Sequence, residues 1–103
     1  MAEILTVFRS RLRGDAYDNG YADHAAAMLE RASSMPGFVS YKSFTADDGE
    51  RVSVIVFASA EDQQRWANDD QHRAAQAAGV RDYYSEYSIE VAEVVRSRHW
   101  ARK

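Results

Sequence analysis

Apolar positions alternate with a period of two in four segments of the chain and recur every three or four residues in two others. The short period is typical of strands and the longer one of amphipathic helices. The predicted strands are residues 4–12, 38–45, 51–58 and 87–96. The predicted helical regions are residues 18–34 and 59–78. The elements therefore follow the order strand, helix, strand, strand, helix, strand.

Both helical regions carry start signals. Asp18 or Asn19 is expected to cap the first helix by accepting hydrogen bonds from free backbone N–H groups. Met35-Pro36-Gly37 is expected to end it, because proline disfavours helical geometry in the preceding residue and glycine permits the reversal. Ser59 with the acid Asp62 three residues later predicts a shortened form of the capping box at the start of the second region.

The second helical region is expected to break in two. Asn68-Asp69-Asp70 interrupts it, and one of the two aspartates caps a short third helix over residues 71–78, which Gly79 terminates. The break matters for function because Trp66 and His72 are six residues apart and lie on different faces of a continuous helix. They converge only if the helix is interrupted between them.

The third predicted strand has no polar face. Val52, Val54 and Val56 point to one side, and Ile55 and Phe57 to the other. The order of elements is that of a ferredoxin-like α+β fold, which places the helices on one face of a four-stranded antiparallel sheet. The other face would expose an apolar patch of several hundred Å², which is unusual for a monomer. We therefore expect a homodimer that packs sheet against sheet about a two-fold axis, a dimeric α+β barrel.

The composition narrows the classes of function. The 103 residues fit one domain, with a core over residues 3–96 and a basic tail over residues 97–103. A net charge of -3 disfavours nucleic acid or an anionic membrane as a partner, since both need a dense basic face. The chain has no cysteine, no apolar run of roughly 18 residues that would span a membrane, and no signal-peptide pattern. We expect a cytoplasmic protein.

Three segments form a recognisable series. They are Met35-Pro36-Gly37-Phe38, the hairpin leading into residues 52–57, and the run from Trp66 through His72-Arg73-Ala74-Ala75 to Tyr84 and Tyr87. The series resembles the antibiotic biosynthesis monooxygenase family of dimeric α+β barrels, over about residues 3–96. Members of that family include cofactor-free oxygenases of aromatic polyketides and quinols, haem-degrading monooxygenases and many proteins of unknown role.

The resemblance implies a pocket between the helices and the sheet for a small aromatic or apolar molecule. It also implies a cofactor-independent reaction, in which deprotonation gives a substrate anion that passes an electron to dioxygen. The protein would supply a base and donors for the developing oxyanion. The candidate catalytic residues are His72, Trp66 and Tyr84. The candidate substrate-binding residues are His24, Met28, Phe8, Tyr83 and Arg81.

Each candidate has a role and a structural alternative. His72 is the candidate base, because histidine titrates near neutral pH. Trp66 would stack on an aromatic substrate, the tyrosines of residues 83–87 would donate to a phenolate, and Arg81 would hold an anionic group. The alternatives are packing roles for the tryptophan and the tyrosines, a solvated or capping His72, and a neutral core histidine at His24.

Haem degradation is disfavoured at two positions. Haem-degrading relatives pair the helix tryptophan with a ligating histidine ten positions later and carry an asparagine on the first strand. Here the ligand position holds Gln76, and the strand position holds Phe8 or Val7. The three histidines, His24, His72 and His99, show no metal-ligand spacing. We expect no cofactor and no metal site.

Two functions besides an oxygenase stay open. The first is a dimeric barrel that binds or senses a small apolar molecule without turnover, and the second is a structural dimer with no ligand. The enzyme and the sensor share the pocket and differ in whether a base lies within hydrogen-bond reach of a bound hydroxyl. A filled space behind Trp66 would favour the structural dimer.

Overall fold

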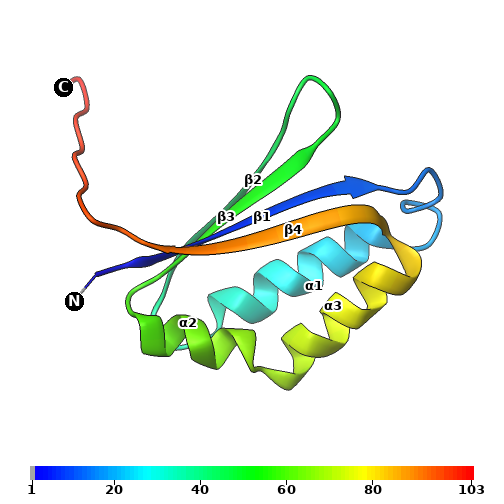
Figure 1. Cartoon of the computed structure of the whole chain (residues 1–103), viewed down its shortest axis with the longest axis horizontal. Coiled ribbons are helices and arrows are strands. Elements are labelled where there is room, and N and C mark those ends of the chain that lie inside the picture. Colours follow the sequence, from blue (N-terminus) through cyan, green and yellow to red (C-terminus); the bar gives the residue numbers. More distant parts are fainter. Residues whose placement is uncertain (1) are drawn as a thin grey trace.

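The computed structural model describes residues 2–103 and contains a four-stranded antiparallel sheet. The strands are β1 (Ile4–Leu12), β2 (Phe38–Thr45), β3 (Arg51–Phe57) and β4 (Tyr84–Glu93). The helices are α1 (Tyr21–Ser33), α2 (Ala60–Ala67) and α3 (Asp70–Asp82). The strand order is β2-β3-β1-β4, and the helices lie on one face of the sheet (Figure 1). The predicted ferredoxin-like α+β fold is confirmed.

The strand register sorts the side chains between two faces. Thr6 lies opposite Ile55, and Phe8 lies opposite Ser53 on one side and Ile89 on the other. Because side chains alternate along a strand, these residues share the face that the helices cover, which we call the inner face. The outer face of β3 carries the valines, as predicted: Val52, Val54 and Val56.

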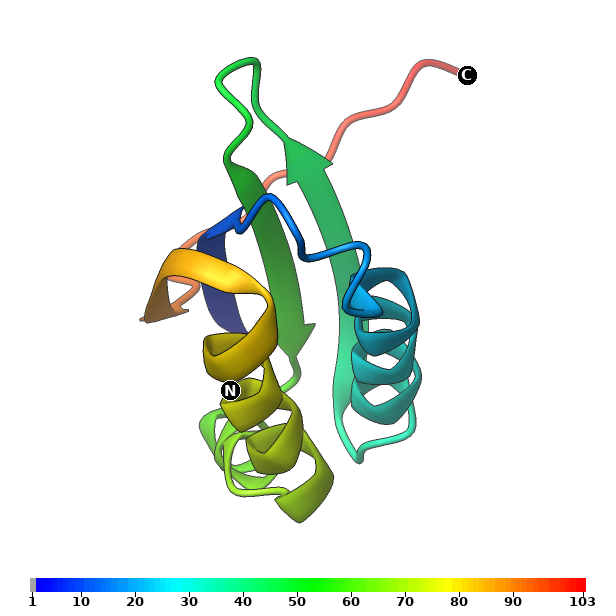
Figure 2. The same ribbon diagram turned by 90° about the vertical axis from the view of Figure 1, so that its right-hand side faces the viewer.

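The helices are arranged in two columns beneath the inner face. α1 lies against β2, and α3 lies beside α1 and against β4 (Figure 2). α2 packs on β3 and places Trp66 over Phe57, with ring centroids 5.4 Å apart. No helix within residues 2–103 combines the length and the apolar character needed to cross a bilayer.

Two clusters of buried side chains hold this arrangement together. One lies between α1, α2 and β3 and comprises Ala32, Ile55, Phe57 and Trp66. The other lies where the loop before α1 meets the end of α3 and comprises Ala16, Tyr21 and Tyr83. The clusters close the two ends of the layer between helices and sheet, and they leave its middle to the cavity described below.

The predicted start of the first helix is wrong by three residues. α1 begins at Tyr21, and its N-cap is Gly20 at φ 94°, with no side-chain cap. Asn19 is not a cap, because its side-chain amide donates to the Asp82 carbonyl at 3.0 Å. The loop is thereby fixed to the end of α3, and the left-handed conformation at Gly20 turns the chain into the helix.

The predicted end of the last helix is also wrong. Gly79 lies inside α3, which continues to Asp82, and β4 begins at Tyr84 in place of Tyr87. A Cβ at Gly79 would lie 2.4 Å from Cε2 of Tyr84. The glycine therefore serves close packing on the tyrosine ring and is not a terminator. At its other end β4 stops at Glu93, so Val95 is not on a strand face and is 97% exposed.

Candidate active site

A cavity of about 450 Å³ lies between the three helices and the inner face of the sheet. Its volume falls in the range of roughly 300–1,000 Å³ that is common for small-molecule sites. Six of the eight predicted site residues line it: Phe8, His24, Met28, Trp66, His72 and Tyr84. They come from β1, α1, α2, α3 and β4.

The two other predicted site residues lie outside the cavity lining. Tyr83 is buried behind it, with its ring 4.5 Å from that of His24 and 5.7 Å from that of Tyr21. Arg81 is on the solvent side of α3, where its side chain is 70% exposed and pairs with Asp82. Because α3 runs past Gly79 to Asp82, Arg81 lies within the helix, on the side that faces away from the site.

The predicted helix break brings Trp66 and His72 together. α2 ends at Ala67, α3 begins at Asp70, and the two rings stack with centroids 4.1 Å apart and planes 27° apart. Trp66 is 3% exposed and also stacks on Phe57, so its indole ring contacts both the His72 and the Phe57 rings. Trp66 therefore packs against the imidazole at the edge of the cavity.

Asp69 fixes the backbone from which His72 projects. As the N-cap of α3, its carboxylate accepts a hydrogen bond from the His72 N–H at 3.0 Å. The same carboxylate forms a two-pronged ion pair with Arg31 of α1. The Arg31 guanidinium, together with the hydrogen bond from His72, lowers the pKa of Asp69 to about 2. One carboxylate thus ties α1 to the helix break.

Four buried polar atoms of the cavity-lining residues have no hydrogen-bond partner in the protein: Thr6 Oγ1, His24 Nε2, Trp66 Nε1 and His72 Nδ1. A buried polar group without a partner costs about 1–3 kcal/mol, and native proteins keep few of them. All four residues line the cavity, and the four atoms themselves lie behind its accessible surface.

Burial keeps both histidines neutral at pH 7. Desolvation lowers the pKa of His72, and the Ala67 carbonyl and the Asp69 carboxylate act in the opposite direction but do not cancel it. Desolvation also lowers the pKa of His24. A neutral imidazole has a free lone pair, so either ring is able to accept a proton from a bound hydroxyl.

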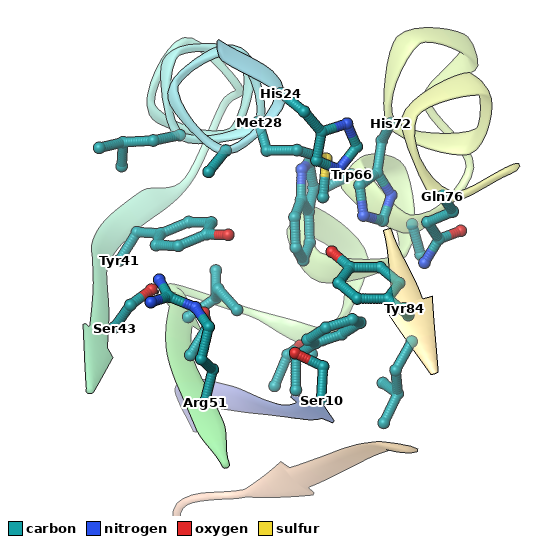
Figure 3. Close-up of a pocket in the computed structure, with 18 of the residues that line it drawn as sticks. Ser10, His24, Met28, Tyr41, Ser43, Arg51, Trp66, His72, Gln76 and Tyr84 are labelled. Atoms are coloured by element: carbon teal, nitrogen blue, oxygen red, sulfur yellow. The ribbon is translucent and has the colours of Figure 1, made fainter. Parts of the chain in front are cut away.

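Burial has the opposite effect on two tyrosines of the cavity. It raises the pKa of Tyr84, with further increases from Tyr21 and Tyr41. It also raises the pKa of Tyr41, while a hydrogen bond with Ser53 acts against that increase. Both phenols therefore stay protonated near neutral pH and are hydrogen-bond donors. Their hydroxyl groups point into the cavity from opposite sides (Figure 3).

Sequence reasoning missed several polar residues of the cavity, which it had placed on strands without assigning them to the site: Thr6, Ser10, Tyr41, Ser43, Arg51 and Ser53. The signal for Arg51 was present in the alternation of β3. Ile55 and Phe57 were assigned to one face, and Arg51 is in phase with them. The structure shows that this face is the one with the cavity.

A smaller cavity of about 150 Å³ adjoins the site between α1 and α3, and it shares His24, Met28, Trp66 and His72 with the main one. The helix pair thus leaves a second gap beside the imidazoles. Within residues 2–103, no group of three or more metal-ligating side chains is clustered.

The sequence matches the family model of antibiotic biosynthesis monooxygenases over residues 4–78, which is most of the chain. The chain belongs to the antibiotic biosynthesis monooxygenase family. The match runs from β1 through most of α3 and includes Trp66, His72 and Arg51. No curated protein matches the sequence.

Solved structures share the fold of this monooxygenase-family chain at low sequence identity. A protein of unknown function from Nitrosomonas europaea has 20% identity and a TM-score of 0.76, over 99% of this chain and 98% of its own. SnoaB, a cofactor-independent oxygenase from Streptomyces nogalater, has 14% identity and a TM-score of 0.78, over 92% and 95%. A dimeric ferredoxin-like protein of unknown function from Jannaschia sp. has 14% identity and a TM-score of 0.75, over 89% and 99%.

Proposed function

We propose that this protein is a cofactor-independent monooxygenase that oxidises a small aromatic or quinol-type substrate in the cavity between the helices and the sheet. The observation that carries the proposal is a cavity of about 450 Å³ lined by the neutral imidazole of His72 and the protonated phenols of Tyr41 and Tyr84. A mostly apolar enclosure with a few polar groups suits an aromatic molecule with hydroxyl or keto groups. Family membership and the likeness to SnoaB support the reaction class.

In this proposal His72 is the general base. Its ring is neutral and borders the cavity. Tyr84 donates a hydrogen bond to the substrate oxygen on which negative charge develops. Trp66 and Asp69 are positioning residues, since one holds the ring of His72 by stacking and the other holds its backbone N–H.

The reaction balances without an external reductant. The base removes a proton from a phenol, or from a CH₂ group between aromatic rings as in an anthrone, and the resulting anion passes one electron to dioxygen. The substrate radical and superoxide then combine, and the C–O bond of a peroxide forms. The peroxide takes up the proton held by the base, and loss of water from a carbon that still bears a hydrogen atom leaves a carbonyl group. This carbon is the former CH₂ group of an anthrone, or an unsubstituted ring carbon ortho or para to the hydroxyl group of a phenol, which becomes a quinone. One oxygen atom enters the product and the other leaves as water, and the substrate supplies all the electrons.

The test is oxygen uptake by the intact protein with a panel of anthrones, naphthols and hydroquinones. The wild type should consume one dioxygen per substrate oxidised, and His72→Gln should lower kcat by about 10²–10⁴-fold. His99→Gln is the matched control, because His99 lies in the exposed tail. Equal rates for wild type and His72→Gln on an active substrate would exclude His72 as the base.

Binding without turnover is the second candidate function. It is favoured by the low exposure of His72, 6%, and by the stacking that restricts its ring. Under this alternative the same panel would bind and change the fluorescence of Trp66, but no member would accelerate oxygen uptake over the protein-free rate.

We also propose that a second copy of the chain covers the outer face of the sheet. That face carries the β3 valines, and Phe44 on the adjacent strand β2 is 53% exposed. A contiguous apolar sheet face is self-complementary under a two-fold axis. The structural neighbour from Jannaschia, described as dimeric, supports this assembly.

A further inference from the structure

The two sides of the cavity differ in charge. Residues 66–76 and Tyr84 supply aromatic and neutral polar groups on one side. On the other side lie Tyr41, Ser43 and Arg51, which Figure 3 shows opposite His72. Among the lining residues within 2–103, Arg51 is the one that carries a charge, and none carries a carboxylate. The site therefore has a fixed positive charge at the side remote from the proposed base.

Arg51 faces inward because of its phase in β3, and the strand pairing places it opposite Ser10 of β1. The acidic residues near it in sequence are used elsewhere. Glu50 receives a two-pronged contact from Arg9, and Asp48 pairs with Arg11. Within residues 2–103, no carboxylate oxygen lies within 4.0 Å of the Arg51 guanidinium, whereas Arg9, Arg11, Arg13, Arg31, Arg65 and Arg81 all have ion pairs.

The contacts of Arg51 with the protein are weak. One nitrogen lies 3.4 Å from Thr45 Oγ1, at the long end of hydrogen-bond distances. The guanidinium carbon lies 5.5 Å from the centroid of the Tyr21 ring, a cation–π contact that uses none of the N–H donors of the guanidinium group.

Hydroxyl groups surround the same side of the cavity. Ser43 and Ser53 face each other across β2 and β3 with their oxygens 2.7 Å apart, and the Tyr41 hydroxyl projects beside them. The Arg51 charge acts on both Tyr41 and Tyr84, since it opposes the rise in pKa that burial causes at each phenol. A guanidinium with neighbouring hydroxyl donors matches the geometry and charge of a carboxylate.

We infer that Arg51 is a specificity-determining residue that binds an anionic group of the ligand, so that the preferred substrates are aromatic acids whose carboxylate lies remote from the hydroxyl-bearing ring. The inference rests on the proposed function for the placement of that ring beside Tyr84 and His72. The carboxylate occupies the side of Arg51 and the serines, and the ring to be oxidised occupies the opposite side.

The experiment compares two ligands of the same shape. One is a naphthoic acid with a hydroxyl group on the ring remote from the carboxylate, and the other is its neutral carboxamide. Calorimetric titration of the intact protein should give a Kd about tenfold to a hundredfold lower for the acid. Arg51→Gln should abolish this preference and keep the affinity for the amide, and Arg51→Lys should retain part of it. Arg81→Gln, a change at an exposed arginine of α3, should leave the preference unchanged.

The outcomes separate a binding role from a structural one. If Arg51 serves only to pack on Tyr21, Arg51→Gln weakens both ligands equally, and that result overturns the inference. Should Arg51→Gln fail to fold, the wild-type preference for the acid must still decrease with ionic strength, and a salt-independent ratio overturns the inference as well. A preference for the acid without oxygen uptake overturns the proposed enzymatic function and supports the binding role of Arg51. Oxygen uptake with no preference for the acid supports the proposed enzyme and overturns the inference about Arg51. Failure of both ligands to bind also overturns the inference about Arg51, and the oxygen-uptake panel still decides the proposed function.

Discussion

The two faces of the sheet are built from the same strands but have opposite chemistry. On β3 the inner side chains run from Arg51 and Ser53 at the hairpin end to the fully buried Ile55 and Phe57. The outer side chains between them are all valines. The inner face lies beneath the helices and borders the cavity, whereas the outer face carries the valines of β3 and is not covered by a helix.

The difference shows how one period-two pattern supports two kinds of recognition. Arginines of β1 border the outer face and are neutralised by acids, as in the pairs Arg9–Glu50 and Arg11–Asp48. On the inner face the single arginine has no such acid. These arginines beside the valines are thus paired within the chain, whereas the charge in the cavity is left for a ligand.

The largest expected effect comes from placing a charge in the outer face. Val54→Arg should abolish dimerisation, because a sheet-to-sheet interface would bury two unpaired guanidinium groups about its two-fold axis. Light scattering should give twice the chain mass of 11.7 kDa for the wild type and a single chain mass for the variant. Val80→Arg, at a residue of α3 that is 58% exposed, is the matched control and should remain dimeric. A monomeric wild type, or a dimeric Val54→Arg protein, would contradict the proposed interface.

The second largest expected effect comes from removing the indole ring of Trp66. Trp66→Ala should lower the free energy of unfolding by about 3–5 kcal/mol, since it leaves a void between Phe57 and His72. Urea unfolding at fixed protein concentration measures the change. Trp100→Ala, in the tail where the indole is 71% exposed, should change it by less than about 0.5 kcal/mol. A small effect at Trp66 would mean that the helix break, and not the stacking, positions His72.

A third test concerns the close approach of α3 to Tyr84. Gly79→Ala should destabilise the fold by about 1–3 kcal/mol, because the added Cβ overlaps the tyrosine ring. Helix propensity alone predicts a gain of about 1 kcal/mol, so the sign of the effect decides between packing and propensity. Gly14→Ala is the control, since a Cβ there meets no atom within 4 Å. Urea unfolding that shows Gly79→Ala to be neutral or stabilising would refute the packing role.

The fold was predictable where local signals and burial agree. The bounds of β1 and β2 follow from alternation and were predicted correctly, as was the helix break at Asn68-Asp69-Asp70. The cap at Ser59 is also confirmed, since its hydroxyl accepts from the Asp62 N–H. In these segments the residue types specify the conformation without reference to distant parts of the chain.

The predictions failed where a tertiary contact gives a residue a different structural role from the one that its local sequence indicates. Gly79 has the type of a terminator, but it is required by a ring five positions later that folds back on the helix. Asn19 has the type of a cap, but its amide bonds the end of α3. Arg51 shares its face with Ser53, yet only the packing of the helices reveals that this face encloses a cavity. Local sequence patterns therefore predicted which side chains share a face of the sheet. Only the packing of the helices on the sheet shows which face encloses the cavity.

The smallest expected effect is a pH dependence of stability that arises on the inner face. Burial lowers the pKa of His72 and of His24 below the ordinary 6.5. The unfolded chain therefore takes up protons first as the pH falls below about 6.5, and the native state loses stability until the lowered pKa values are reached. The groups that face His72 are the Asp69 carboxylate, paired with Arg31, and His24 across the gap between α1 and α3.

Urea unfolding at a series of pH values between about 7.5 and 5 should show this loss, with a slope of at most about 1.4 kcal/mol per pH unit for each histidine. His72→Gln should remove part of the slope, and His99→Gln in the tail should leave it unchanged. Asp69 does not interfere, because its pKa of about 2 in the folded state, against 3.8, confines its contribution to lower pH. An unchanged slope in His72→Gln would mean that His72 is not held neutral, and the inner face would then lose its proposed base.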